Sequence, residues 1–129
     1  MTRLKGILFL LDVFQTMEQK NWELGIMGDG ALLPGIKARV GNDRRFKIYG
    51  WLEGEDRDRI IQESDFIMAP SICYENLPTI IALGFKYDRP TIASDIGGMK
   101  EAIKEGINGY LFKAGDKEDL KRVLKKILI

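Results

Sequence analysis

The sequence contains no histidine and a single cysteine, Cys73. Without histidine, the side chain that most often acts as a general base is missing, so proton transfer would have to use carboxylates, lysine, tyrosine or a partner domain. Structural zinc sites are built mainly from cysteine and histidine, and we therefore expect no metal site. One cysteine also excludes an internal disulfide framework, which favours a reducing compartment such as the cytoplasm.

A long hydrophobic run is missing as well. The apolar stretch at residues 6–11 is far shorter than the roughly 20 residues that cross a bilayer. It ends at Asp12 with no small-residue cleavage site after it, which is unlike a secretory signal peptide. Both observations favour a cytoplasmic location.

Neither sign of charge is in large excess, because 20 Lys and Arg residues face 19 Asp and Glu residues, for a net charge of +1. Domains that bind nucleic acid usually have a clear basic excess, so we expect no nucleic-acid partner. The length of 129 residues corresponds to one domain, residues 1–129, and a hydrophobic fraction of 45% is enough for a core.

Short apolar runs alternate with helical periodicity along the chain. Continuous apolar strands of this kind are typical of a parallel sheet that is covered on both faces. We therefore predict a Rossmann-like three-layer α/β/α domain with a mainly parallel sheet. Residues 7–11 could instead form a strand, since periodicity alone does not separate a buried helix from a buried strand. The predicted helices span residues 5–19, 32–40, 53–63, 77–87, 99–105 and a last segment capped by Asp116; the predicted strands span 22–27, 46–49, 66–69, 90–94 and 109–112.

The candidate binding edge follows from the predicted strands, because ligands of parallel α/β sheets bind at the carboxyl ends of the strands. The segments directly after these strands are rich in glycine, proline and polar residues. They are residues 28–30, 50–51, 70–75 and 94–98.

Residues 70–78 read PSICYENLP, which resembles the signature loop of the group 1 (family 4) retaining glycosyltransferases. Further pieces follow the same order and spacing: Lys5-Gly6, GDG at 28–30, FKIYG at 46–50, RPTIASDIGG at 89–98 and EGINGYLF at 105–112. These enzymes have the GT-B fold of two Rossmann-like halves. The resemblance covers nearly the whole chain and implies that it is the C-terminal, donor-binding half.

The resemblance also implies a nucleoside diphosphate sugar as donor substrate, with no cofactor and no metal. Lys5 and Glu75 match the catalytic positions: the lysine neutralises the diphosphate leaving group, and the glutamate binds hydroxyls of the donor sugar. Backbone N–H groups at the start of the following helix would hold the phosphates. The implied substrate-binding residues are Gly28, Gly50, Ser71, Asn76, Leu77, Pro78, Thr79 and Leu83.

Each of these residues also has a purely structural interpretation. Glu75 could be a solvated carboxylate at a helix N-terminus, and Lys5 could be a surface lysine. Glycine after a strand, including Gly28, Gly50 and the pair Gly97-Gly98, often serves only to turn the chain.

Leu83 is the first departure from the resembled family, in which a second glutamate eight residues after the first binds the nucleotide ribose. A leucine accepts no hydrogen bond from a ribose hydroxyl. Loss of a charged acceptor costs about 1.5–3 kcal/mol, or one to two decades in affinity.

The first strand of the family domain is the second departure. The sequence starts almost at the following helix, while the missing strand belongs in the middle of the sheet. An unfilled gap would leave buried N–H and C=O groups unpaired. We therefore expect a rearranged segment such as residues 7–11, or a strand from another copy in a homodimer, to fill it.

The acceptor-binding half is absent too, so the leading hypothesis is the donor-binding domain of a retaining glycosyltransferase that transfers a hexosyl group. Full activity would require an N-terminal acceptor-domain partner, and any peripheral membrane association would come through that partner. The alternative is a non-catalytic, degenerate or engineered scaffold that keeps the fold. A dehydrogenase-like domain is not expected, because no Gly-x-Gly-x-x-Gly motif follows a first strand.

Overall fold

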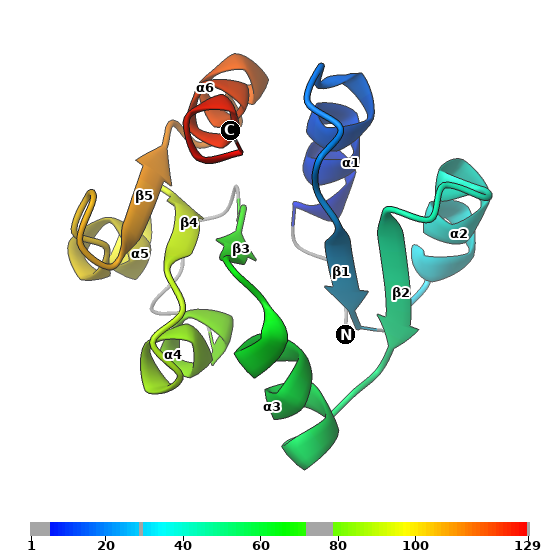
Figure 1. Cartoon of the computed structure of the whole chain (residues 1–129), viewed down its shortest axis with the longest axis horizontal. Coiled ribbons are helices and arrows are strands. Elements are labelled where there is room, and N and C mark those ends of the chain that lie inside the picture. The colour runs from blue at the N-terminus through cyan, green and yellow to red at the C-terminus, as the bar shows by residue number, and fades with distance from the viewer. Residues whose placement is uncertain (1–5, 29, 72–78, 129) are drawn as a thin grey trace.

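The protein is described by a computed structural model that covers residues 6–28, 30–71 and 79–128. In these residues, helices and parallel strands alternate along the chain and form three layers (Figure 1), as predicted. The helices are α1 (Ile7–Thr16), α2 (Leu33–Val40), α3 (Gly54–Glu63), α4 (Thr79–Lys86), α5 (Gly97–Ala102) and α6 (Lys117–Ile127). The strands are β1 (Leu24–Met27), β2 (Phe46–Gly50), β3 (Ile67–Ala69), β4 (Thr91–Ser94) and β5 (Gly109–Phe112).

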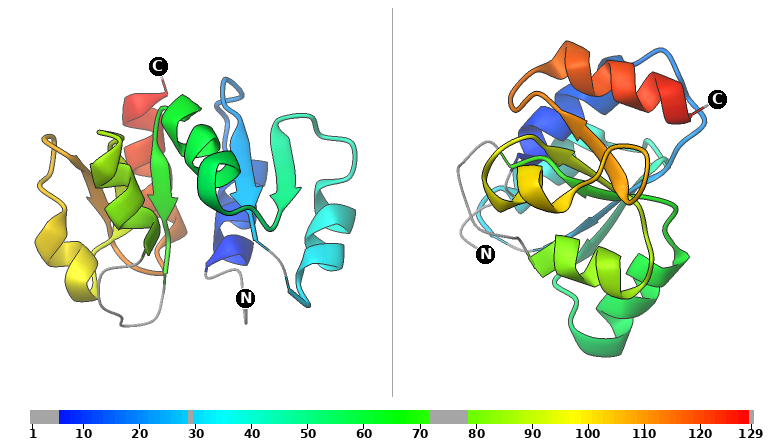
Figure 2. Two further views of the ribbon diagram at one scale, coloured as in Figure 1. Left: turned by 90° about the horizontal axis from the view of Figure 1, so that it is seen from below. Right: turned by 90° about the vertical axis from the view of Figure 1, so that its left-hand side faces the viewer.

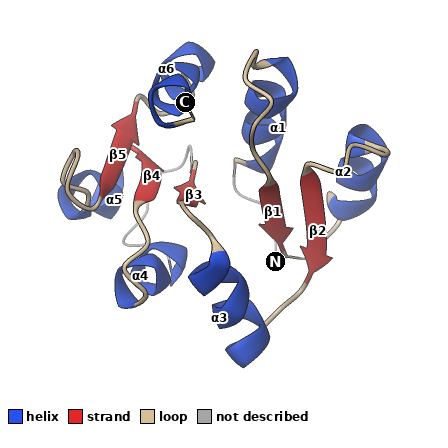
Figure 3. Cartoon of the chain, viewed as in Figure 1, coloured by secondary structure: helices blue, strands red, loops and turns tan. Residues whose placement is uncertain are grey.

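The strands form two separate parallel sheets. β1 pairs with β2, and β3, β4 and β5 pair in that order (Figure 3). Within the described residues no strand pairing joins β1 to β3. The parallel architecture is thus confirmed, while the sheet is divided at the place where the sequence indicates a missing strand.

Residues 7–16 are helical, so the expectation that residues 7–11 fill the gap as a strand is wrong. Ile7, Leu10 and Phe14 are buried, and their spacing places them on one side of a helix. A strand buried on both faces would also hide Leu8, whose side chain is 46% exposed. The apolar run is amphipathic at the helical period, which decides between the two alternatives.

Helix α5 begins and ends earlier than the predicted 99–105. It starts at Gly97, whose φ of 60° is readily adopted only by glycine. The Asn108 side chain then accepts a hydrogen bond from the Lys104 N–H at 2.6 Å and donates one to the Ala102 carbonyl at 3.0 Å. The asparagine thereby satisfies groups at the helix C-terminus that a longer helix would have paired internally.

One hydrophobic cluster extends across both sheets. It includes Ile26 of β1, Ile92 of β4 and Leu11 of α1. Helices α1 and α6 lie together on one face of the strands, and α3 and α4 lie on the other (Figure 2). Side-chain packing, rather than backbone pairing between β1 and β3, therefore holds the described parts together.

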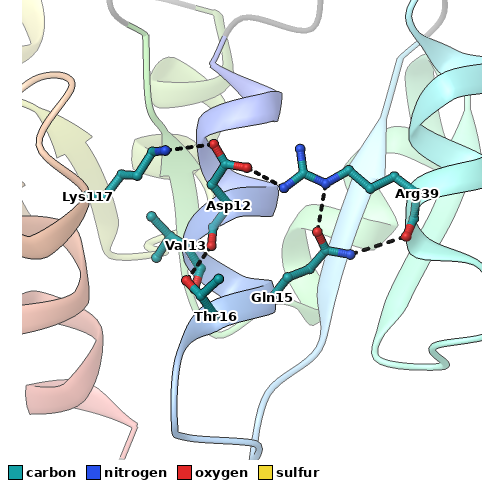
Figure 4. Close-up of polar contacts among 6 residues, drawn as sticks. All are labelled: Asp12, Val13, Gln15, Thr16, Arg39 and Lys117. Carbon is teal, nitrogen blue, oxygen red and sulfur yellow. Dashed lines mark hydrogen bonds and ion pairs between the residues drawn. The ribbon is translucent and has the colours of Figure 1, made fainter.

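Asp12 is a polar link between helices on the two sides of the divided sheet (Figure 4). Its carboxylate forms ion pairs with Arg39 of α2 and with the Lys117 Nζ of α6, the latter at 2.9 Å. Gln15, one turn further along α1, accepts a hydrogen bond from the Arg39 Nε at 2.7 Å. Arg39, followed by Lys117, lowers the pKa of Asp12 below its ordinary value.

We expect Asp12→Asn to lower the free energy of unfolding at pH 7 by about 1 kcal/mol or less, because the carboxylate is partly exposed. A lowered folded-state pKa contributes stability that is complete above the ordinary pKa of 3.8. The contribution is lost as the pH falls through the lowered pKa. Urea unfolding of the variant and the original chain should therefore differ most near neutral pH and converge in acid.

The matched control for this prediction is Asp56→Asn. Among the described residues the exposed Asp56 is paired with Arg59 of its own helix, at 3.7 Å. It lies in the first turn of α3, so its removal costs one exposed pair and the weak interaction of one carboxylate with the helix N-terminus. Equal effects of the two substitutions would show that Asp12 does not connect the helices.

Candidate functional site

Gly28, which follows β1, and Gly50, which ends β2, lie side by side at the carboxyl edge of the two-stranded sheet. The Gly28 N–H donates to the Gly50 carbonyl at 2.6 Å. The φ angles are 143° for Gly28 and 74° for Gly50, a region that favours glycine. The β1–β2 register shifts just before this point, so that Met27 is opposite Gly50. Two predicted binding glycines are thus brought together.

Gly6 packs directly against Pro70, the residue that follows β3. A Cβ built on Gly6 would lie only 2.9 Å from the Pro70 carbonyl carbon and 3.0 Å from its Cγ. Gly6 also has a φ of 72° and precedes the first turn of α1. Gly6, at the start of α1, is therefore held against the start of the segment that resembles the glycosyltransferase loop.

Ser71, Thr79 and Leu83 are the other predicted site residues that the structure describes. Ser71 is buried next to Pro70. Thr79 is exposed at the start of α4 as described, and Leu83 follows one turn later, half-buried. Residues four apart share a helix face, so Thr79 and Leu83 belong to one side of α4.

Gly84, beside Leu83, allows α4 to lie close to the three-stranded sheet. A Cβ there would lie 3.0 Å from the Thr91 Oγ1 and 3.3 Å from the Ile67 Cγ1. The position of α4, and hence of Thr79 and Leu83, is therefore fixed by close packing on β3 and β4.

The remaining predicted site residues lie outside the described residues. These are the two predicted catalytic residues and three substrate-binding residues: Lys5, Glu75, Asn76, Leu77 and Pro78. Their roles stay predictions.

Ser94, at the carboxyl end of β4, belongs to the predicted binding edge at residues 94–98, although it was not predicted as a binding residue. Its side chain is fully buried, and its Oγ has no hydrogen-bond partner among the described residues. A buried hydroxyl without a partner is costly. Its position at the start of the segment 94–98 was its signal in the sequence, whereas the burial of a serine follows from neighbours that are distant in sequence.

Asp95 and the pair Gly97-Gly98 have structural roles in the described residues. The Asp95 carboxylate accepts a hydrogen bond from the Ala114 N–H at 3.1 Å, which ties the end of β4 to the segment after β5. The two glycines form the start of α5. These contacts agree with the interpretation in which the glycines turn the chain into the helix.

A cavity of about 1460 Å³ extends from this edge into the space between the two sheets. Pro70, Ser71 and Thr79 line it at the carboxyl edge, while Asn21 and Trp22 line it at the opposite end. In the described ranges, no group of three or more Asp, Glu or Cys side chains is arranged to hold a metal ion. Among the same residues, no helix is both long and apolar enough to cross a membrane.

The chain is similar in sequence to known proteins. The family model described as "Glycosyl transferases group 1" matches residues 1–129. Among curated proteins, the amylovoran biosynthesis glycosyltransferase AmsK of Erwinia amylovora is 23% identical over 98% of this chain and 34% of its own length. The lipopolysaccharide 1,6-galactosyltransferase of Salmonella typhimurium is 27% identical over 83% of this chain and 31% of its own length.

Solved structures share the fold. The lipopolysaccharide outer core galactosyltransferase WaaB aligns with a TM-score of 0.82 at 25% identity, over 98% of this chain and 37% of that enzyme. Anabaena HepE, solved in complex with UDP and glucose, aligns with a TM-score of 0.81 at 21% identity, over 98% of this chain and 36% of that protein. The chain therefore spans about a third of the length of these proteins.

We expect Gly6→Ala to destabilise the chain by more than the cost of its backbone conformation. A left-handed backbone costs a non-glycine residue about 1–2 kcal/mol. The collision with Pro70 adds about 1–3 kcal/mol of overpacking. Urea unfolding measures the sum, and amide exchange at Ser71 reports whether the segment after β3 is displaced.

Gly115→Ala is the matched control, because Gly115 has a φ of 74° and, apart from its chain neighbours, no described residue has an atom within 4 Å of the position that its Cβ would take. Gly115→Ala should lose only the free energy that a left-handed backbone costs a non-glycine residue. If the two variants lose equal stability and Ser71 exchange is unchanged, the contact between Gly6 and Pro70 does not position the site.

Proposed function

The chain belongs to the group 1 glycosyltransferases, and on that premise we propose that it is the donor-binding domain of a retaining glycosyltransferase. The reaction would move a hexosyl group from a nucleoside diphosphate sugar to an acceptor with retention of configuration. UDP and glucose in the HepE complex support this class of donor.

The observation that carries the proposal is the contact between Gly6 and Pro70, together with the Gly28–Gly50 hydrogen bond. Both occur where β1, β2 and β3 end, the edge at which parallel α/β domains bind their ligands. Segments that are separated in the sequence and resemble the donor-binding motifs of the family therefore converge on one edge.

Lys5 and Glu75 take the chemical roles in the proposed site. Lys5 directly precedes Gly6, and its ammonium would stabilise the negative charge that develops on the leaving diphosphate. Backbone N–H groups at the start of the helix after residues 70–78 would hold the phosphates. Glu75 would bind hydroxyls of the sugar. Because the lysine and the N–H groups carry the phosphate charge, the proposal invokes no metal ion.

An acceptor-binding partner half completes the proposed enzyme. The chain spans about a third of the relatives' length, which leaves ample polypeptide in those proteins for a second half. A domain that binds the donor but lacks an acceptor site would bind nucleotide without transferring sugar. We therefore propose that residues 1–129 alone are inactive.

A non-catalytic scaffold is the second candidate, and Leu83 favours it. This residue lies half-buried on α4, one turn after Thr79, at the position where the family has a ribose-binding glutamate. Its apolar side chain would leave two ribose hydroxyls unpaired. The two candidates differ in nucleotide affinity.

Calorimetric titration with UDP, GDP and ADP tests the proposal. We expect one nucleotide to bind with micromolar to millimolar affinity, and Leu83→Glu to tighten that binding about ten- to a hundredfold by restoring a charged acceptor. Glu75→Ala should leave nucleotide binding nearly unchanged and weaken binding of the corresponding nucleotide sugar.

Ala82→Glu provides the control for added charge, because Ala82 is exposed on the same helix and adjacent to Leu83. It should not tighten nucleotide binding. If no nucleotide binds up to millimolar concentration, even to Leu83→Glu, the domain has kept the fold without the donor site, and the scaffold interpretation holds.

A further inference from the structure

A second cleft lies at the amino edge of the three-stranded sheet, opposite the candidate site. Pro90, which directly precedes β4, and Asn108, which directly precedes β5, both line it. Its volume is about 350 Å³, within the roughly 300–1,000 Å³ of pockets that hold small molecules. The described residues that line this cleft include none of those predicted to bind the donor, so it is a separate feature of the molecule.

Asp88 lines this cleft in a backbone conformation that glycine adopts at lower cost. In the described residues it is the one non-glycine residue with a positive φ, 54°. The Asp88 N–H donates to the Phe85 carbonyl at 3.2 Å, and the Arg89 N–H donates to the Gly84 carbonyl at 2.8 Å. This is the Schellman pattern that ends a helix, and glycine is the usual residue where Asp88 stands. The chain therefore has a carboxylate here in spite of the strain that it brings.

Arg89 is a half-buried cation that also lines the cleft. Its Nε is buried and has no hydrogen-bond partner among the described residues. In the same part of the chain, neither Arg89 nor its neighbour Asp88 forms an ion pair. A guanidinium that has lost part of its hydration is stabilised when a carboxylate binds its remaining N–H groups through charge-assisted hydrogen bonds. The unpaired arginine thus indicates an anionic group as its ligand.

Apolar side chains form much of the remaining wall of the cleft. Phe85 and Pro90 are partly buried, whereas Ile107 is 84% exposed, more than any other large hydrophobic side chain in the described residues. All three line the cleft. A ligand with an apolar body would remove this surface from water, which favours binding in proportion to the area covered.

We propose that this cleft binds a free apolar amino acid in its zwitterionic form. The ligand carboxylate accepts hydrogen bonds from Arg89, and the ligand ammonium group meets the Asp88 carboxylate. The ligand side chain lies against Phe85 and Ile107. A cation and an anion side by side suit a zwitterion better than a phosphate, because Asp88 repels additional negative charge. This inference does not depend on the donor-binding proposal, since the two sites lie at opposite edges of the strands.

The test is a titration of the full chain with L-leucine, followed in nitrogen–proton correlation spectra. Two analogues each lack one charge of the ligand: N-acetyl-L-leucine has no ammonium group, and L-leucinamide has no carboxylate. The variants Arg89→Gln and Asp88→Gly remove the corresponding charges of the protein. Lys86→Gln is the matched control, because Lys86 is an exposed cation at the end of α4 that does not line the cleft.

We expect leucine to shift the amides of Gly84, Arg89 and Asn108, with a dissociation constant on the order of millimolar. The Gly28 amide, at the carboxyl edge, should stay in place. Arg89→Gln should weaken leucine binding by about tenfold or more and leave the weaker binding of leucinamide unchanged. Lys86→Gln should change neither.

Asp88→Gly separates binding from stability. The substitution should raise the urea midpoint, because glycine adopts the positive φ without strain. It should weaken leucine binding by about two- to fivefold, the range expected for an exposed ion pair. Binding of N-acetyl-leucine, which has no ammonium group to lose a partner, should be unchanged. A purely structural aspartate would change the midpoint alone.

Three results would overturn the proposal. Leucine at tens of millimolar could shift none of the amides that border the cleft. Arg89→Gln could bind leucine as tightly as the original chain does. N-acetyl-leucine could bind as tightly as leucine, with no effect of Asp88→Gly on leucine affinity, which would show that the cleft takes the carboxylate end of a polypeptide instead. No nucleotide is among the probes, so failure here is distinct from failure of the proposed function.

Discussion

The packing of α1 across the two sheets is the interaction on which the rest of the structure depends. No strand pairing joins β1 to β3 in the described residues, so the connection consists of side chains. Leu11 of α1 belongs to the same buried cluster as Ile26 of β1 and Ile92 of β4. Asp12 adds ion pairs to α2 and α6. The apolar contacts supply most of the free energy, because partly exposed ion pairs contribute about 1 kcal/mol or less.

The candidate site also depends on the packing of α1, because its segments come from both sheets. Gly28 directly follows a strand of one sheet and Gly50 ends its neighbour, whereas Ser71 follows a strand of the other sheet. Their relative positions are maintained by α1, through its core contacts and the contact of Gly6 with Pro70. A ligand that binds only the folded arrangement stabilises it by mass action. Donor binding should therefore favour this relation of the two sheets.

The local sequence pattern predicted the helices and strands well, but it could not predict which strands pair with each other. Residues 109–112 were predicted as a strand and form β5, and Asp116 was predicted to cap the last helix and accepts a hydrogen bond from the Asp119 N–H at 3.0 Å. Such features depend on neighbours in sequence. The division of the sheet, the unpaired hydroxyl of Ser94 and the close approach of Gly6 to Pro70 depend on segments far apart in sequence. Hydrophobic periodicity indicates which side of a helix or strand is buried, but not which distant segment packs against that side.

For the candidate site, the resemblance to the family identified Gly28, Gly50 and Ser71, and the structure brings the segments around them to one edge.

Chemical-shift mapping with a nucleotide sugar tests the central claim most directly, namely that the donor binds at the carboxyl ends of β1, β2 and β3. The measurement is a nitrogen–proton correlation spectrum of the chain, recorded during titration with UDP-glucose and, separately, with the GDP and ADP sugars. The account predicts that one donor shifts the amides of Gly28, Gly50, Ser71 and Thr79 together, while amides at the opposite edge, such as Trp22 and Thr91, stay in place. Shifts confined to that opposite edge, or no shift with any donor at millimolar concentration, would contradict it.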